Sequence, residues 1–158
     1  MPALITTCKL NQLLDAVAFR LSLSVKPKAG LNLVPTPVTV KRVIRLGDFT
    51  GLAKPILAVQ SISWNATPGC ASRFEGVLRF VVHVLVTAKE GGGDEIDLLN
   101  LCTDVIRAMN VDISFGGLVT MCFPLEFTPM VDQSSALTGF AQAAITYEAT
   151  YTWDAETP

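Results

Sequence analysis

Near the C-terminus, apolar and polar residues alternate with a period of two from residue 142 to residue 154. One face carries alanine, isoleucine, tyrosine and tryptophan, and the other carries mostly threonine, glutamine and glutamate. Alternation over so long a segment is typical of a half-buried β-strand. The pattern therefore predicts a sheet-based protein whose last and most aromatic strand spans residues 137–154.

A helical period appears in two other segments. Leucine, valine and alanine recur at positions i, i+3, i+4 and i+7 through residues 7–22, which predicts an amphipathic helix. Asp94, Glu95 and Asp97 stand where a second helix would begin, and its dipole favours acidic side chains there. The apolar stripe of this helix, predicted over residues 94–109, is Leu98, Leu99, Cys102, Val105, Ile106 and Met109.

Apolar runs between turn-forming residues predict four further strands, over residues 38–46, 56–64, 73–87 and 118–130. The segments 26–37 and 47–55 are rich in proline and glycine, so we expect loops there. Short turns at 65–72 and 132–135 favour antiparallel hairpins. The predicted order is α-β-β-β-α-β-β. It describes one α+β domain over residues 1–158, a mainly antiparallel five-stranded sheet with two helices packed on one face.

The strand 73–87 has one face that is apolar throughout and one that mixes glutamate, arginine and histidine with valine and leucine. Helices are the natural cover for the apolar face. We expect something else to contact the mixed face.

Half of the residues are apolar and only 16% are charged, against a usual quarter, and the mean hydropathy is +0.44. Such a chain either enters a membrane or buries extra surface against copies of itself. The longer uncharged stretches, such as residues 55–72, are interrupted by proline, glycine, asparagine and serine, so we expect no membrane span. No basic segment precedes the first apolar residues, so we expect no signal peptide. Burial in an oligomer is the better explanation.

The charge and cysteine content narrow the cellular setting. The net charge of −2 gives no basic surface for wrapping nucleic acid, although DNA can pass nearby without tight binding. The four cysteines include no Cys-x-x-Cys pair, and we expect them to be reduced and intracellular.

No group of residues predicts catalysis, a metal site or a cofactor. His83, the only histidine, has no cysteines at ligand spacing, and Cys70 would need a base such as His83 to act as a nucleophile. Three glycines at 91–93 precede a helix, but the acidic first turn repels the phosphate that such a loop can bind. We therefore expect neither catalytic nor metal-binding residues, and no enzyme activity.

Interaction with other proteins is the role expected of the surface residues. Lysines and arginines gather around the strand 38–46 and in the two flanking loops, where they suit an acidic partner, DNA or solvent. Aromatic side chains more often anchor a core or an interface than line a ligand pocket. The residues that we expect at an interface are Lys28, Leu33, Arg42, Arg45, Phe49, Lys54, Trp64 and Arg73.

Three segments carry a likeness to a known family: residues 13–17 (LLDAV), residues 97–106 (DLLNLCTDVI) and residues 144–151 (AITYEATY). With the order of elements, they resemble the tail terminator proteins, also called tail completion or neck proteins, of long-tailed bacteriophages. The resemblance spans nearly the whole chain and rests on a pattern of elements, with no catalytic signature.

The resemblance implies a structural virion protein of the tail or neck, assembled in the host cytoplasm. Members of that family form a hexameric ring on the last ring of the tail tube, stop tube growth and join the tail to the head. The implied partners are further copies of the chain, the tail tube protein, the head–tail connector or neck proteins, and genomic DNA passing through the lumen. Neither a cofactor nor a membrane is implied.

Two other interpretations stand beside this one. The first is another neck or tail-tube-related protein with a similar layout. The second is a small-ligand-binding α+β domain, with aromatic strand faces lining a cavity. A ring with a central hole favours the terminator, and a dry pocket that holds a lipid or metabolite favours the ligand-binding domain.

Overall fold

The computed structural model describes residues 9–24, 38–43, 55–68, 73–87, 93–130 and 140–154. In chain order the elements are α1 (Lys9–Ser24), β1 (Thr39–Arg42), β2 (Ile56–Pro68), β3 (Arg73–Thr87), α2 (Gly93–Asn110), β4 (Met121–Met130) and β5 (Phe140–Asp154). The predicted order α-β-β-β-α-β-β is confirmed.

The strands form one five-stranded sheet in the order β1-β2-β3-β5-β4. The β2–β3 and β4–β5 pairs are antiparallel, as the short turns predicted. The β3–β5 pair, which no short turn joins, is antiparallel as well, and the β1–β2 pair is parallel. A parallel pair needs a longer connection than a hairpin does, and residues 43–55 supply one. The sheet is therefore mixed but mainly antiparallel.

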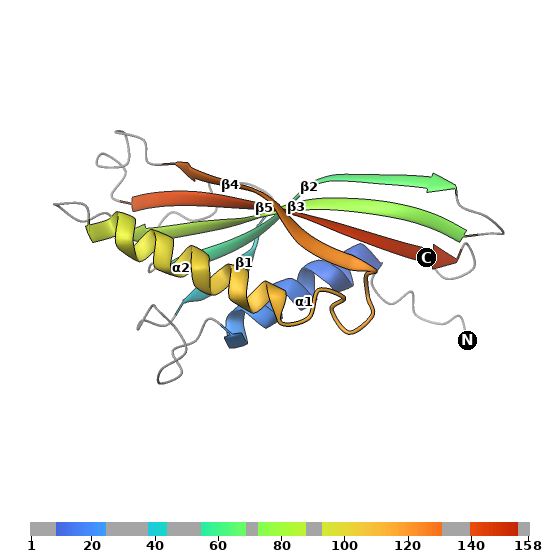
Figure 1. Cartoon of the computed structure of the whole chain (residues 1–158), viewed down its shortest axis with the longest axis horizontal. Helices are drawn as coiled ribbons and strands as arrows, with labels where there is room; N and C mark the ends of the chain where they lie inside the picture. The colour runs from blue at the N-terminus through green and yellow to red at the C-terminus, as the bar shows by residue number, and fades with distance from the viewer. Residues whose placement is uncertain are drawn as a thin grey trace.

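Both helices lie on the same side of the sheet (Figure 1). α1 packs on β1 and β2, α2 packs on β3, β5 and β4, and the two helices contact each other. The main core forms between them and the sheet. It includes Leu14 and Val17 of α1, Leu98 and Val105 of α2, and Phe80 of β3. These five residues belong to the apolar stripes seen in the sequence, and all are buried.

The connection from α2 to β4 is built around the carboxylate of Asp112. Its oxygens accept hydrogen bonds from the Ser114 amide (2.9 Å), the Ser114 hydroxyl (2.6 Å) and the Gly116 amide (2.7 Å). These bonds hold the pKa of Asp112 down to about 2, from a usual 3.8. The guanidinium of Arg20 lies 3.7 Å from the centre of the Phe115 ring and also pairs with Asp112, which ties α1 to this turn.

The mixed face of β3 is buried as well over part of its length. Val81, His83 and Leu85 are all nearly inaccessible to solvent. Leu85 joins Ile56 and Ala58 of β2 in a second, smaller apolar cluster, against which Val43 packs. This half of the sheet is therefore covered on both faces.

Some boundaries differ from the predicted ones. β2 continues to Pro68, although Asn65 and Pro68 suggested a turn from residue 65, because these residues pair with β3 in the ladder. β4 begins at Met121, since the chain is still turning through residues 118–120 after Gly116 and Gly117, both at positive φ. β1 is limited to four residues. The expected loops 26–37 and 47–54 lie outside the described residues.

Candidate interaction surface

β2 loses its neighbour on one side halfway along its length. Among the described residues, β1 pairs with β2 from Ile56 to Val59, and the last backbone contact between them is the Val43 amide donating to the Val59 carbonyl (3.0 Å). Beyond it, residues 61–67 pair with β3 on one side, and no described strand pairs with the other. All seven of these residues are exposed, whichever face of the sheet they belong to. We call this segment the β2 edge.

The β2 edge begins with a β-bulge. The register with β3 shifts between Ser61 and Ser63, which makes Ile62 an extra residue in the strand. Bulges redirect side chains and are common where a sheet edge has a role of its own. Ile62 is 55% exposed, so the residue placed at the bulge is a large apolar one facing solvent.

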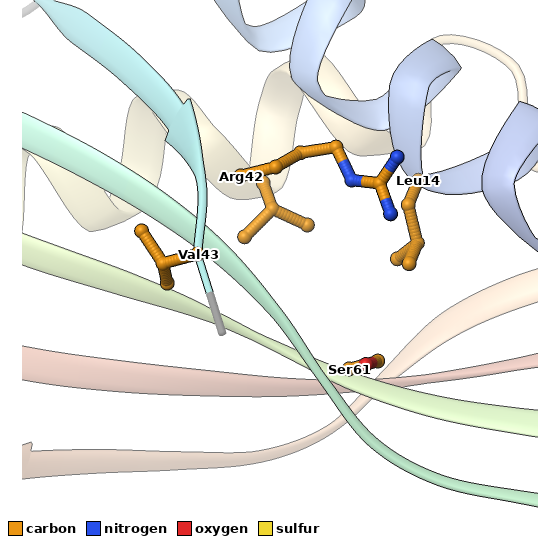
Figure 2. Close-up of a pocket in the computed structure, with 5 residues that line it drawn as sticks. Leu14, Arg42, Val43 and Ser61 are labelled. Carbon is orange, nitrogen blue, oxygen red and sulfur yellow. The ribbon is translucent and has the colours of Figure 1, made fainter. Parts of the chain in front are cut away.

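A groove runs between α1 and the β2 edge. It consists of two adjoining depressions of about 270 Å³ and 290 Å³ that share Leu14, Arg42 and Ser61 (Figure 2). Leu10 and Leu78 add to its apolar lining, and Ile62 and Trp64 line it from β2. The groove is large enough to receive an apolar side chain from another molecule.

Arg42 is held in place at this groove by α1. Its guanidinium donates to Asp15 Oδ1 (2.7 Å) and to Asn11 Oδ1 (3.0 Å). Both charged side chains are substantially exposed, so the ion pair contributes at most about 1 kcal/mol to stability. Its main effect is to fix a positive group beside the apolar lining. A guanidinium has five donors, so it can also bind a second acceptor.

Trp64 is anchored at one end and open at the other. Its indole Nε1 donates a hydrogen bond to the hydroxyl of Tyr151 on β5. Trp64 and Tyr151 reach each other across β3. Gly76 of β3 pairs with Ala66, two residues after Trp64, on one side and with Tyr151 on the other. A glycine at this place has no side chain to separate the two aromatic groups. Tyr151 is buried, whereas half of the Trp64 surface is exposed. Trp64 is therefore an oriented aromatic side chain at the surface.

The opposite margin of the sheet has the same character. Residues 124–129 of β4, here called the β4 edge, are all exposed and include Leu125 and Phe127. This strand also has a register shift, between Pro124 and Glu126, which makes Leu125 its extra residue. β2 and β4 thus each place an exposed apolar residue at a bulge.

The proline positions on β4 decide how this edge can bind. The Thr120 amide donates to the Thr150 carbonyl (2.8 Å), so the backbone of Thr150 faces β4. In an antiparallel pair, the backbone groups of successive residues point alternately toward and away from the partner strand. Tyr147 and Ala143 are an odd number of residues from Thr150, so their backbone groups face away from β4. Their partners Pro124 and Pro129 therefore direct their ring nitrogens away from β5. A proline nitrogen cannot donate a hydrogen bond. At these two positions a partner strand would find no backbone donor, so the β4 edge favours contact through side chains over extension of the ladder.

The expected interface residues fall in different places. Arg42 and Trp64 are brought together at the groove. Arg73 is exposed at the start of β3, opposite Asp154, and does not line the groove. Lys28, Leu33, Arg45, Phe49 and Lys54 lie outside the described residues. The sequence reasoning missed Ile62, Leu125 and Phe127. The two prolines inside an apolar strand were the available signal for an outer strand on that side.

His83 is engaged in a buried polar network on the mixed face. Gln142 Nε2 donates to its Nδ1 (3.2 Å), so the proton is on Nε2, which donates to Gln60 Oε1 (2.9 Å). Burial lowers the pKa of His83 and keeps it neutral. Burial also raises the pKa of the Cys102 and Cys122 thiols to about 12, far from a reactive thiolate. These residues stabilise the fold.

No three histidine, cysteine or acidic side chains gather in the described part of the chain, as a metal site would require. None of the described helices is long and apolar enough to cross a bilayer.

No protein-family model matches the chain, and no curated protein is significantly similar to it in sequence.

Proposed function

We propose that the chain is a structural subunit of a phage tail, of the tail terminator type. Copies of it form a ring at the end of the tail tube, stop tube growth and provide the surface that joins tail to head. The proposal rests on the resemblance of three segments and on the layout of two helices over one face of a mainly antiparallel sheet. One observation carries it beyond layout: β2 and β4 each contain a segment that is exposed on both faces and bears large apolar side chains.

Such strands are unusual in an isolated domain. An antiparallel strand normally buries one face and exposes the other. Ile62, Trp64, Leu125 and Phe127 leave apolar area in water, at a cost of about 25 cal/mol per Å². Ile62 and Trp64 line one groove together, and exposed apolar side chains that gather in this way are typical of a protein–protein contact. Two such surfaces at opposite edges of one sheet fit a protein that contacts a neighbour on each side.

The partners follow from this role. They are further copies of the chain, in a ring we propose to be hexameric, the tail tube protein on one side and the connector or neck proteins on the other. The net charge of −2 suits a lumen through which genomic DNA passes without being held. The protein is then a component of the virion, assembled in the host cytoplasm.

The test is the mass and symmetry of the purified protein, alone and mixed with assembled tail tubes. Native mass spectrometry should give one closed oligomer. Negative-stain images should show a ring with a central hole, free or at one end of each tube. Rings along the whole tube would identify a tube-like protein. A chain that stays monomeric and also ignores tube ends would contradict the proposal.

The ligand-binding alternative expects a cavity between aromatic strand faces. Tyr147 stacks on Phe80, with ring centres 5.5 Å apart, and the buried Tyr151 accepts a hydrogen bond from Trp64, so both tyrosines belong to the core. The depression of about 340 Å³ that Tyr151 borders is lined mostly by polar residues, among them Asn65, Thr67 and Thr150, and by no further aromatic side chain. The structural role is therefore the one that we propose.

A further inference from the structure

The two bulges adjoin the same row of paired residues. Ser61 pairs with Phe80, Phe80 with Tyr147, and Tyr147 with Pro124, so these four residues form one row across β2, β3, β5 and β4. Ile62 follows Ser61 and Leu125 follows Pro124. Because β2 and β4 run in opposite directions, Ile62 and Leu125 flank this row on opposite sides, about 3.3 Å apart along the strands, one at each edge of the sheet.

We infer that the contact between neighbouring subunits joins the β4 edge of one copy to the β2 edge of the next, with Leu125 packed against Ile62 in the groove beside Trp64. The inference rests on the proposed ring and names the surfaces that build it. Two different edges of one sheet make a head-to-tail contact, which repeats from copy to copy.

The shared row limits the shift that such a contact needs. A head-to-tail contact gives a ring when each copy is rotated with no advance along the axis, and a filament when it advances. Ile62 and Leu125 flank one row, so joining them requires a shift of about one residue along the strands. The contact therefore stays close to the level of that row, as the proposed ring requires.

Charge and shape complement each other at the two edges. Glu126 is the only charged residue of β4, and it stands between Leu125 and Phe127. The groove that receives this edge has Arg42 fixed at its wall by Asp15 and Asn11, with donors remaining for a second carboxylate. Its larger depression of about 290 Å³ accommodates one large apolar side chain such as Leu125. Pro124 and Pro129 keep the contact on side chains, as the groove requires.

The experiment uses matched substitutions in the full chain. Ile62→Asp alters the β2 edge and Leu125→Asp the β4 edge. Ile96→Asp and Leu99→Asp are the controls, because Ile96 and Leu99 are on the outer face of α2 and are about as exposed as Ile62 and Leu125. We expect each edge variant to fold. Assembly of each edge variant should be at least about thirty-fold weaker than that of the wild type, as after loss of a central interface residue. Each control should assemble like the wild type. Folding is checked by circular dichroism and assembly by analytical ultracentrifugation, in the condition where the wild type assembles.

Mixing the two edge variants tests the head-to-tail geometry. The Ile62→Asp protein keeps an intact β4 edge, and the Leu125→Asp protein keeps an intact β2 edge. Their mixture should give particles of two 16.9-kDa chains and nothing larger. No pairing in the mixture would overturn the inference. Normal rings from either folded edge variant would also overturn it. Dimers of the Leu125→Asp protein alone would do so as well, because they would mean that two β2 edges meet. In each case a ring-forming wild type leaves the proposed function standing, whereas a wild type that never assembles removes both.

Discussion

Leu98→Ala measures how much the helix layer contributes to this fold. Leu98 of α2 is 1% exposed and belongs to the main core. Its replacement by alanine removes three carbon atoms, which corresponds to about 2.4 kcal/mol at about 0.8 kcal/mol per buried CH₂. The space left behind adds to this loss, so we expect the free energy of unfolding to fall by about 2.5–5 kcal/mol.

The neighbouring leucine is the control. Leu99 is 45% exposed on the same helix, so Leu99→Ala loses about half of the transfer free energy and regains a few tenths of a kcal/mol from alanine's helix propensity, for a net cost of about 1 kcal/mol. Urea unfolding followed by circular dichroism gives both values, at one fixed chain concentration because association would stabilise the folded state. A Leu98→Ala cost below about 0.5 kcal/mol, or one no larger than that of Leu99→Ala, would show that α2 does not pack as described.

Three further substitutions test individual polar groups. Tyr147→Phe removes a buried hydroxyl that has no hydrogen-bond partner among the described residues, so stability should stay within about 1 kcal/mol of the wild type or rise; a larger loss in urea unfolding would reveal a missed partner. Asp112→Asn tests a carboxylate whose pKa is lowered to about 2. The contribution of this carboxylate to stability is complete above about pH 4 and is lost towards pH 2. The unfolding free energies of the wild type and the variant should therefore converge over that range. His83→Gln tests a histidine whose pKa is lowered by burial. Because protonation favours the unfolded chain, wild-type stability should fall as the pH drops below about 6.5, and the variant should show a smaller fall. Equal pH profiles of the two proteins would mean that His83 is not buried as a neutral group.

The fold was predictable because most of its elements obey one period each. The two apolar stripes place Leu14 and Leu98 in the core, and the strict alternation of β3 separates Phe80 from His83 on opposite faces. The parallel pairing of β1 with β2 was not predictable from the pattern. Period-2 alternation says which face a residue is on and nothing about the direction of the neighbouring strand.

The candidate interaction surface was predictable only in part. Arg42 and Trp64 stand out by residue type, and both line the groove. Ile62 and Leu125 do not, because in the sequence they resemble ordinary core residues of a strand. What exposes them is a shift in ladder register, and register is set by pairing with β3 and β5. Segment 65–68 was assigned to a turn because asparagine and proline favour turns locally, whereas its pairing with β3 keeps it in the strand.

The β2 edge follows from the unequal lengths of helices and strands. β3 and β5, at fifteen residues each, span about 50 Å at about 3.3 Å per residue, whereas the sixteen residues of α1 span about 24 Å. The strands β2, β3 and β5 accordingly run on past the described helices (Figure 1). β3 and β5 still satisfy one another's backbone groups there, so the sheet persists beyond its helix layer. β2 has no described neighbour on its other side beyond Val59, the last residue that β1 pairs with, and residues 61–67 are exposed. These residues of β2, with an isoleucine at the bulge and an oriented tryptophan after it, leave apolar area in water in an isolated copy. The proposed contact with a second copy would bury that area and so offset its cost.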